Sequence, residues 1–99
     1  MTREKILNVA NMAFRTGEPE KAEMLYRKII EQDPRYAPAY NGLGLVFQSR
    51  GKEGLREAIR YFRMAVEIDP RYVECWNNLA RAYYTQGNFP EVEKAFLKS

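Results

Sequence analysis

Apolar residues recur along the chain at intervals of three and four positions. Segments 40–47 and 76–83 each carry an aromatic residue, a leucine three positions later and a second aromatic four positions after that. This spacing places the apolar side chains on one face of an α-helix, whereas a half-buried strand would alternate apolar and polar residues. Glycines and Asp-Pro pairs, which are typical of helix ends, separate the apolar segments. The pattern predicts six helices, over 3–16, 19–32, 37–50, 54–68, 73–86 and 90–98.

The helix pattern repeats along the chain. The tetrapeptide DPRY occurs at 33–36 and again 36 residues later at 69–72, and aromatic, leucine and small positions follow it at the same lag. Gly17, Gly51 and Gly87 recur at intervals of 34 and 36 residues. We therefore predict one all-α domain over 1–99, made of three helix pairs at 3–36, 37–72 and 73–99, the last of them incomplete.

Two of these stretches carry a family motif. Residues 40–47 and 76–83 have the pattern aromatic-x-x-Leu-small-x-x-aromatic, and residues 58–62 follow as Ala-x-x-x-aromatic before the closing Asp-Pro. They resemble tetratricopeptide repeats, whose period is about 34 residues. The second unit has two extra residues near 51–54, as Sel1-like repeats do, but the Asp-Pro closures favour the tetratricopeptide family. The resemblance implies an α-α superhelix, a solenoid of three antiparallel helix-turn-helix repeats with aromatic and small residues in its core.

The composition removes most catalytic chemistry. The chain contains no histidine, which is the usual general base and the commonest metal ligand. Cys75 is the only cysteine, so neither an intrachain disulfide nor a thiolate zinc site can form. Paired carboxylates, a glycine-rich phosphate loop and clustered metal ligands are all missing from the sequence pattern. We therefore expect no enzyme, no cofactor and no metal, and we interpret Cys75 as a packing residue.

Charge and hydropathy limit the partners. The formal charge of +3 comes from basic and acidic residues that alternate, whereas nucleic-acid surfaces carry clustered basic charge. No apolar run approaches the roughly 18–20 residues that cross a bilayer. We expect a cytoplasmic protein without membrane contact, whose partner is a protein or a peptide.

The resemblance also implies a binding site, because the first helices of tetratricopeptide repeats line a concave groove that holds an extended peptide. The corresponding face here is rich in amides, which can pair with a bound backbone whatever its side chains, although amides also suit a solvated surface. A clamp for a C-terminal carboxylate, as in co-chaperone members, is not matched, since only Asn11 agrees and Glu74 would repel the ligand. The expected groove residues are Leu7, Asn8, Asn11, Phe14, Asn41, Leu45, Gln48, Glu74, Asn77, Asn78, Arg81 and Tyr84, with Phe14, Arg81 and Tyr84 giving selectivity.

The final helix supports an alternative function. Its segment PEVEKAFLKS ends with Phe96 and Leu97, and no later residue covers them. Helical arrays need a polar capping element on their last apolar face, so either further helices follow in the natural protein or two copies associate through this end. RNA binding by helical repeats is a third hypothesis, supported only by a pI near 9.1.

Overall fold

The computed structural model describes residues 1–98 and contains six α-helices in that range. The helices are α1 (Arg3–Arg15), α2 (Pro19–Gln32), α3 (Ala37–Gln48), α4 (Lys52–Ile68), α5 (Val73–Gln86) and α6 (Phe89–Lys98). The predicted all-α architecture is confirmed, and most helix ends fall within one residue of their predicted positions.

The turn between α3 and α4 is the place where the predicted boundaries were wrong. α3 ends at Gln48 and α4 begins at Lys52, both two residues earlier than the sequence pattern indicated. Gly51 makes the turn with a φ of 73°, a backbone conformation that glycine adopts more readily than any residue with a Cβ atom. Gly54 lies inside the first turn of α4, where a Cβ atom would come within 2.0 Å of the Phe47 carbonyl oxygen. The second glycine therefore serves close helix packing rather than the turn.

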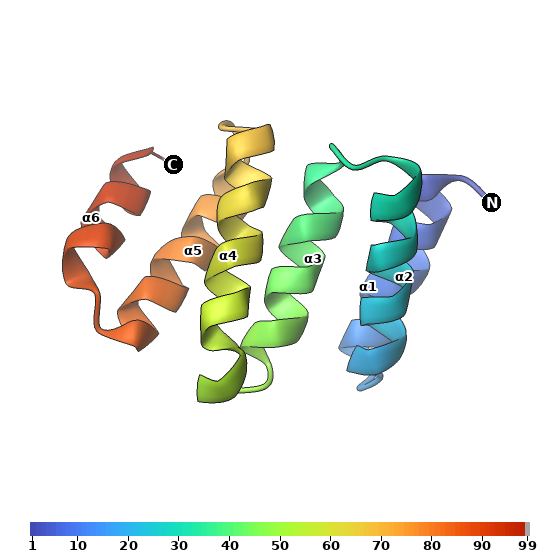
Figure 1. Cartoon of the computed structure of the whole chain (residues 1–99), viewed down its shortest axis with the longest axis horizontal. Coiled ribbons are helices and arrows are strands. Elements are labelled where there is room, and N and C mark those ends of the chain that lie inside the picture. The colour runs from blue at the N-terminus through green and yellow to red at the C-terminus, as the bar shows by residue number, and fades with distance from the viewer. Residues whose placement is uncertain (99) are drawn as a thin grey trace.

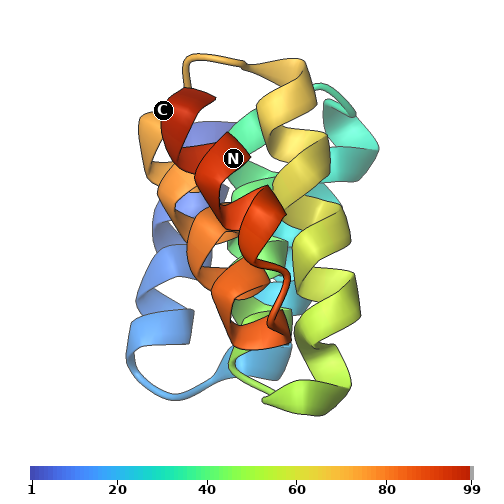
Figure 2. The same ribbon diagram turned by 90° about the vertical axis from the view of Figure 1, so that its left-hand side faces the viewer.

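The helices form three antiparallel pairs that stack side by side in a row, with the two termini at opposite ends (Figure 1). Each helix packs on the next one in the chain, and α3 also touches α1 and α5. The described chain measures 41 × 26 × 18 Å. Figure 2 looks along the row from the α6 end. Within residues 1–98, every helix is too short or too polar to cross a bilayer.

The two DPRY turns, at 33–36 and 69–72, join one helix pair to the next. In each turn the aspartate side chain accepts a hydrogen bond from the arginine N–H two residues on, at 3.2 and 3.1 Å. The proline carbonyl then accepts a hydrogen bond from the first aromatic residue of the following helix. Tyr40 donates through its hydroxyl and Trp76 through its indole nitrogen, both at 2.8 Å. The repeated aromatic position therefore anchors each turn as well as packing.

Aromatic rings and glycines meet in the core. Tyr26 and Phe62 are 1% and 0% exposed. A Cβ atom at Gly42 would lie 2.3 Å from the Tyr26 ring, and one at Gly44 would lie 2.4 Å from the Phe62 ring. These glycines let α3 approach α2 and α4 closely, so their place in the motif has a packing cause. Cys75 is fully buried, as its interpretation as a packing residue requires.

Candidate functional site

The first helices of the three pairs line a groove of about 380 Å³. Its apolar part comes from α1 and α3, and its polar part from amides, one arginine and one glutamate. Six of the expected groove residues contribute to it: Leu7, Asn11, Phe14, Asn41, Leu45 and Glu74. The lining is completed by five residues that the sequence pattern did not indicate as groove residues: Arg15, Tyr26, Pro38, Gly42 and Tyr72.

Tyr26 reaches this groove from α2 and fixes the orientation of Asn11. The phenol O–H of Tyr26 donates a hydrogen bond to the Asn11 side-chain oxygen. Burial raises the pKa of Tyr26, so the hydroxyl keeps its proton at neutral pH and remains a donor. With its oxygen occupied, Asn11 retains the amide NH₂ as a donor toward a ligand in the groove. The aromatic pattern identified Tyr26 only as core, because the hydroxyl gives no periodic signal.

Asn41 and Asn78 bind each other. Their side chains are only 5% and 6% exposed, and the Asn78 amide nitrogen donates to the Asn41 oxygen across 3.0 Å. Tyr72 lies beside this pair at the start of α5, and burial raises its pKa to about 12. The two amides thus connect α3 to α5, and Asn41 also lines the groove at the point where these helices meet.

The remaining expected residues do not join this groove. Asn77, Arg81 and Tyr84 line a separate hollow of about 380 Å³ together with Ala80, Val92 and Phe96. Asn8 is exposed on α1, and Gln48 is half-buried at the end of α3; neither lines either hollow. The twelve expected residues therefore divide into six in the groove at the α1–α3 end, three in the hollow at the α5–α6 end, two outlying positions, and Asn78, which lines neither and is buried against Asn41.

The α5–α6 end exposes large apolar side chains. Tyr84 and Phe89 are 65% and 58% exposed, with ring centroids 5.5 Å apart in an edge-to-face contact. Phe96 is 56% exposed, whereas its counterparts in the earlier pairs, Tyr26 and Phe62, are buried. The Tyr26 ring lies against Gly42 of α3, the first helix of the next pair, and the Phe62 ring lies against Gly44 of the same helix.

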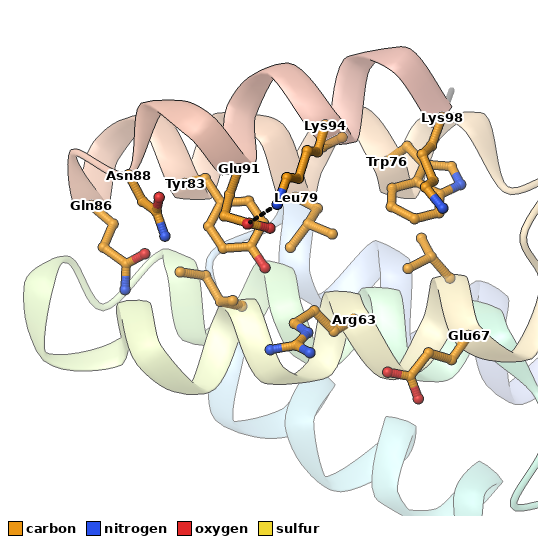
Figure 3. Close-up of a pocket in the computed structure, with 13 residues that line it drawn as sticks. Arg63, Glu67, Trp76, Leu79, Tyr83, Gln86, Asn88, Glu91, Lys94 and Lys98 are labelled. Carbon is orange, nitrogen blue, oxygen red and sulfur yellow. Dashed lines mark hydrogen bonds and ion pairs between the residues drawn. The ribbon is translucent and has the colours of Figure 1, made fainter.

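A larger groove of about 610 Å³ lies between α4 and α6, with α5 as its floor (Figure 3). Trp76, Leu79 and Tyr83 rise from α5, while Arg63 projects from α4 and Lys94 from α6. The repeat pattern indicated that its aromatic residues belong to the core, and it did not predict this groove. Its position on the second-helix side separates it from the groove lined by α1 and α3.

Comparison with known proteins supports the repeat assignment. A sequence model of the tetratricopeptide repeat matches residues 61–94, and solved tetratricopeptide structures superpose on almost the whole chain. The chain has the fold of tetratricopeptide-repeat proteins. Proteins of this family are generally non-enzymatic scaffolds. A search of curated protein sequences finds no match.

Three solved tetratricopeptide structures illustrate the similarity. The second tetratricopeptide domain of Spaghetti (RPAP3), bound to the HSP90 peptide SRMEEVD, has a TM-score of 0.87 at 20% identity, covering 97% of this chain and 87% of that one. MamA has a TM-score of 0.86 at 27% identity, covering 98% and 56%. The human IFIT1 dimer with PPP-AAAA has a TM-score of 0.89 at 26% identity, covering 99% and 25%. The chain thus spans about half of MamA and a quarter of IFIT1.

The side chains of the groove lined by α1 and α3 are suited to non-covalent contact with a ligand. Within residues 1–98, no group of three or more cysteine, aspartate or glutamate side chains could hold a metal ion. The side chains that line the α1–α3 groove offer apolar contact, amide hydrogen bonds and one charge of each sign. Such a surface can hold and orient a peptide, with the amide of Asn11 pairing to its backbone.

Proposed function

We propose that this protein is a non-catalytic interaction scaffold that binds an extended peptide segment of a partner in the groove of its first helices. The observation that carries the proposal is the lining of that groove. Leu7, Phe14 and Leu45 provide apolar contacts beside Asn11, whose oriented amide can pair with a backbone carbonyl. The Spaghetti domain with the same fold holds a peptide from HSP90, which supports a peptide as the ligand.

The charges of the groove favour a neutral or weakly basic segment. Glu74 lies at the α5 end of the lining and Arg15 at the α1 end. An acidic tail such as the one bound by the Spaghetti domain would meet Glu74 with like charge, which costs affinity and slows association. The ligand therefore differs in charge from that peptide.

Panning a random peptide library on the folded chain, followed by NMR titration of the recovered peptides, tests this proposal. We expect chemical-shift changes at Leu7, Asn11 and Leu45, and affinity at least about tenfold lower for Leu45→Arg. Met64→Arg is the matched control, since Met64 is also partly exposed but lies on α4 at the second-helix side. Shifts confined to α2, α4 and α6, or no recovered peptide, would count against the proposal.

Self-association through the α5–α6 end is the second candidate. Tyr84, Phe89, Phe96 and Leu97 expose large apolar side chains there, and exposed apolar surface on folded proteins marks interaction sites. Human IFIT1 is solved as a dimer, which supports association as a use of this fold. Light scattering should show a mass that rises with concentration, and Phe96→Glu or Leu97→Glu should abolish the rise. A constant monomer mass at high concentration excludes this candidate.

RNA binding has less support. Human IFIT1 is solved with PPP-AAAA, but RNA affinity rests on clustered basic side chains. The groove of the first helices offers Arg15 against Glu74, so its charges cancel.

A further inference from the structure

The side of the molecule formed by the second helices carries two grooves that the repeat makes equivalent. One lies between α2 and α4 over α3, with a volume of about 430 Å³, and the other lies between α4 and α6 over α5, with about 610 Å³. Each of the eight residues that line the first groove has a counterpart in the lining of the second, at a lag of 36 or 34 residues. Arg27, Ile30, Glu31, Tyr40, Leu43, Arg60, Tyr61 and Met64 of the first groove match Arg63, Val66, Glu67, Trp76, Leu79, Lys94, Ala95 and Lys98 of the second.

The decisive difference is Tyr61 against Ala95. Tyr61 is 7% exposed, and its ring centroid lies 5.4 Å from that of Phe47. The guanidinium groups of Arg27 and Arg60 lie 5.8 and 5.3 Å from the centre of the Tyr61 ring, within the range of cation–π attraction. The earlier groove therefore has an aromatic ring of the chain itself in its lining, held beside one ring and two cations.

The later groove keeps these surroundings without the ring. Tyr83 stands at the position of Phe47, Arg63 at that of Arg27 and Lys94 at that of Arg60. In Figure 3, Tyr83 projects between α4 and α6 with Arg63 below it and Lys94 above it. Ala95, which is 3% exposed, ends at its Cβ atom, so this groove has no ring at the position of Tyr61.

The charges around the later groove also differ. Arg27 pairs with Glu23 at 3.0 Å, but the counterpart of Glu23 is Ile59, and among residues 1–98 Arg63 pairs with no carboxylate. Lys98 replaces Met64 at the far end of the groove. Lys94 pairs with Glu91 at 3.2 Å. The groove therefore has a cation, Arg63, whose counterpart is neutralised within the chain.

We propose that the groove between α4 and α6 binds an aromatic side chain, phenylalanine or tyrosine, carried by an acidic segment of a partner protein. The ring takes the place that Tyr61 fills in the earlier groove and stacks beside Tyr83. A carboxylate next to it in the partner pairs with Arg63, as Glu23 does with Arg27. This site lies on the opposite side from the groove of α1, α3 and α5, and it is independent of the ligand proposed there.

Trp76 reports on this site directly. It is the only tryptophan of the chain and lies in the floor of the groove. The probe is a blocked pentapeptide with a central phenylalanine flanked by two acidic residues on each side. Two comparison peptides replace the phenylalanine by alanine or the acidic residues by lysine. We expect the phenylalanine peptide to change the Trp76 emission saturably, with both comparison peptides at least about tenfold weaker.

Four variants locate the contact, two within the groove and two as controls. Ala95→Tyr supplies the ring that the earlier groove contains. This variant should fold and should bind the phenylalanine peptide with at least about tenfold lower affinity. Arg63→Glu should lower the affinity for this peptide by a similar factor. Arg56→Glu, an exposed change on the same helix, should leave the affinity unaltered. Leu45→Arg, which disrupts the groove of the first helices, also leaves it unaltered. Any of three results overturns the proposal: the alanine peptide binds as tightly as the phenylalanine peptide, Ala95→Tyr binds the phenylalanine peptide as tightly as the parent chain, or no peptide changes the Trp76 emission.

Discussion

Asn78 of α5 donates a 3.0 Å hydrogen bond to Asn41 of α3, and both side chains are buried where the two helices meet. Asn78→Ala would leave the Asn41 oxygen buried without this donor. A buried polar group that loses its partner costs about 1–3 kcal/mol, so we expect a loss of that size in the free energy of unfolding. Urea unfolding followed by circular dichroism measures it.

The neighbouring Asn77 is the matched control for this change, because its side chain is exposed. Asn77→Ala should alter the free energy of unfolding by less than about 0.5 kcal/mol. If the two alanine variants prove equally stable, the asparagine pair does not connect α3 to α5.

Gly42 allows α3 to lie against the ring of Tyr26. Gly42→Ala places a methyl group 2.3 Å from the present ring position, and the ring is buried and bonded to Asn11. Overpacking of this kind costs about 1–3 kcal/mol, which exceeds the gain of up to about 1 kcal/mol from replacing a helical glycine by alanine. We expect a lower melting temperature. Asn8→Ala, at the first-pair counterpart of this position, should change it little, and unchanged stability of Gly42→Ala would show that the contact is loose.

Glu23 ties α2 to the end of α3 through Arg50, and it also pairs with Arg27 at 3.0 Å. Burial would raise the pKa of this carboxyl, but the two arginines outweigh burial and hold it below its ordinary value of 4.5. A lowered folded pKa means that the stabilisation is complete above the unfolded pKa and is lost as the pH falls through the folded pKa. At neutral pH we therefore expect Glu23→Gln to cost about 0.5–1 kcal/mol.

The pH dependence separates this effect from packing. The difference between Glu23→Gln and the parent chain should shrink as the pH falls below 4.5 and vanish once Glu23 is protonated in the folded state. Glu20→Gln, on the exposed side of α2, should show no such trend. A Glu23→Gln difference that persists in acid would assign the loss to packing.

Cys75 should be chemically inert in the folded protein. Its side chain is fully buried, its thiol donates to the Phe62 carbonyl oxygen at 3.4 Å, and burial raises its pKa to about 12. Because the thiolate is the reactive form, the folded chain should react with iodoacetamide about a thousandfold more slowly at pH 8 than the chain unfolded in urea. The alkylation rate checks this, and equal rates in both states would contradict the burial of Cys75.

The repeat made the helices predictable. Aromatic, leucine and small positions at a common lag indicate which residues face a neighbouring helix, and glycine and Asp-Pro indicate where helices end. The turn at 49–51 was misplaced because Gly54 resembles a turn residue in sequence, whereas its role depends on how closely α4 approaches the Phe47 backbone.

The site was predictable only in part, because side-chain pairing depends on the rotation and spacing of the helices. The sequence pattern places Asn41 and Asn78 on the face of the first helices, but only their three-dimensional arrangement shows that they bind each other. The groove between α4 and α6 has Ala95 where the corresponding groove between α2 and α4 has Tyr61. Comparison of the repeats at their common lag could have indicated that difference.

Photo-cross-linking locates the bound peptide and tests the central claim most directly. A photoreactive phenylalanine analogue replaces Phe14, which lines the groove of the first helices, or Phe89, an exposed aromatic residue of α6. A peptide recovered by panning on the folded chain is then added and irradiated. We predict that the Phe14 position gives at least about tenfold more cross-linked peptide than the Phe89 position. Equal yields, or cross-linking from Phe89 alone, would contradict binding in the groove of α1, α3 and α5.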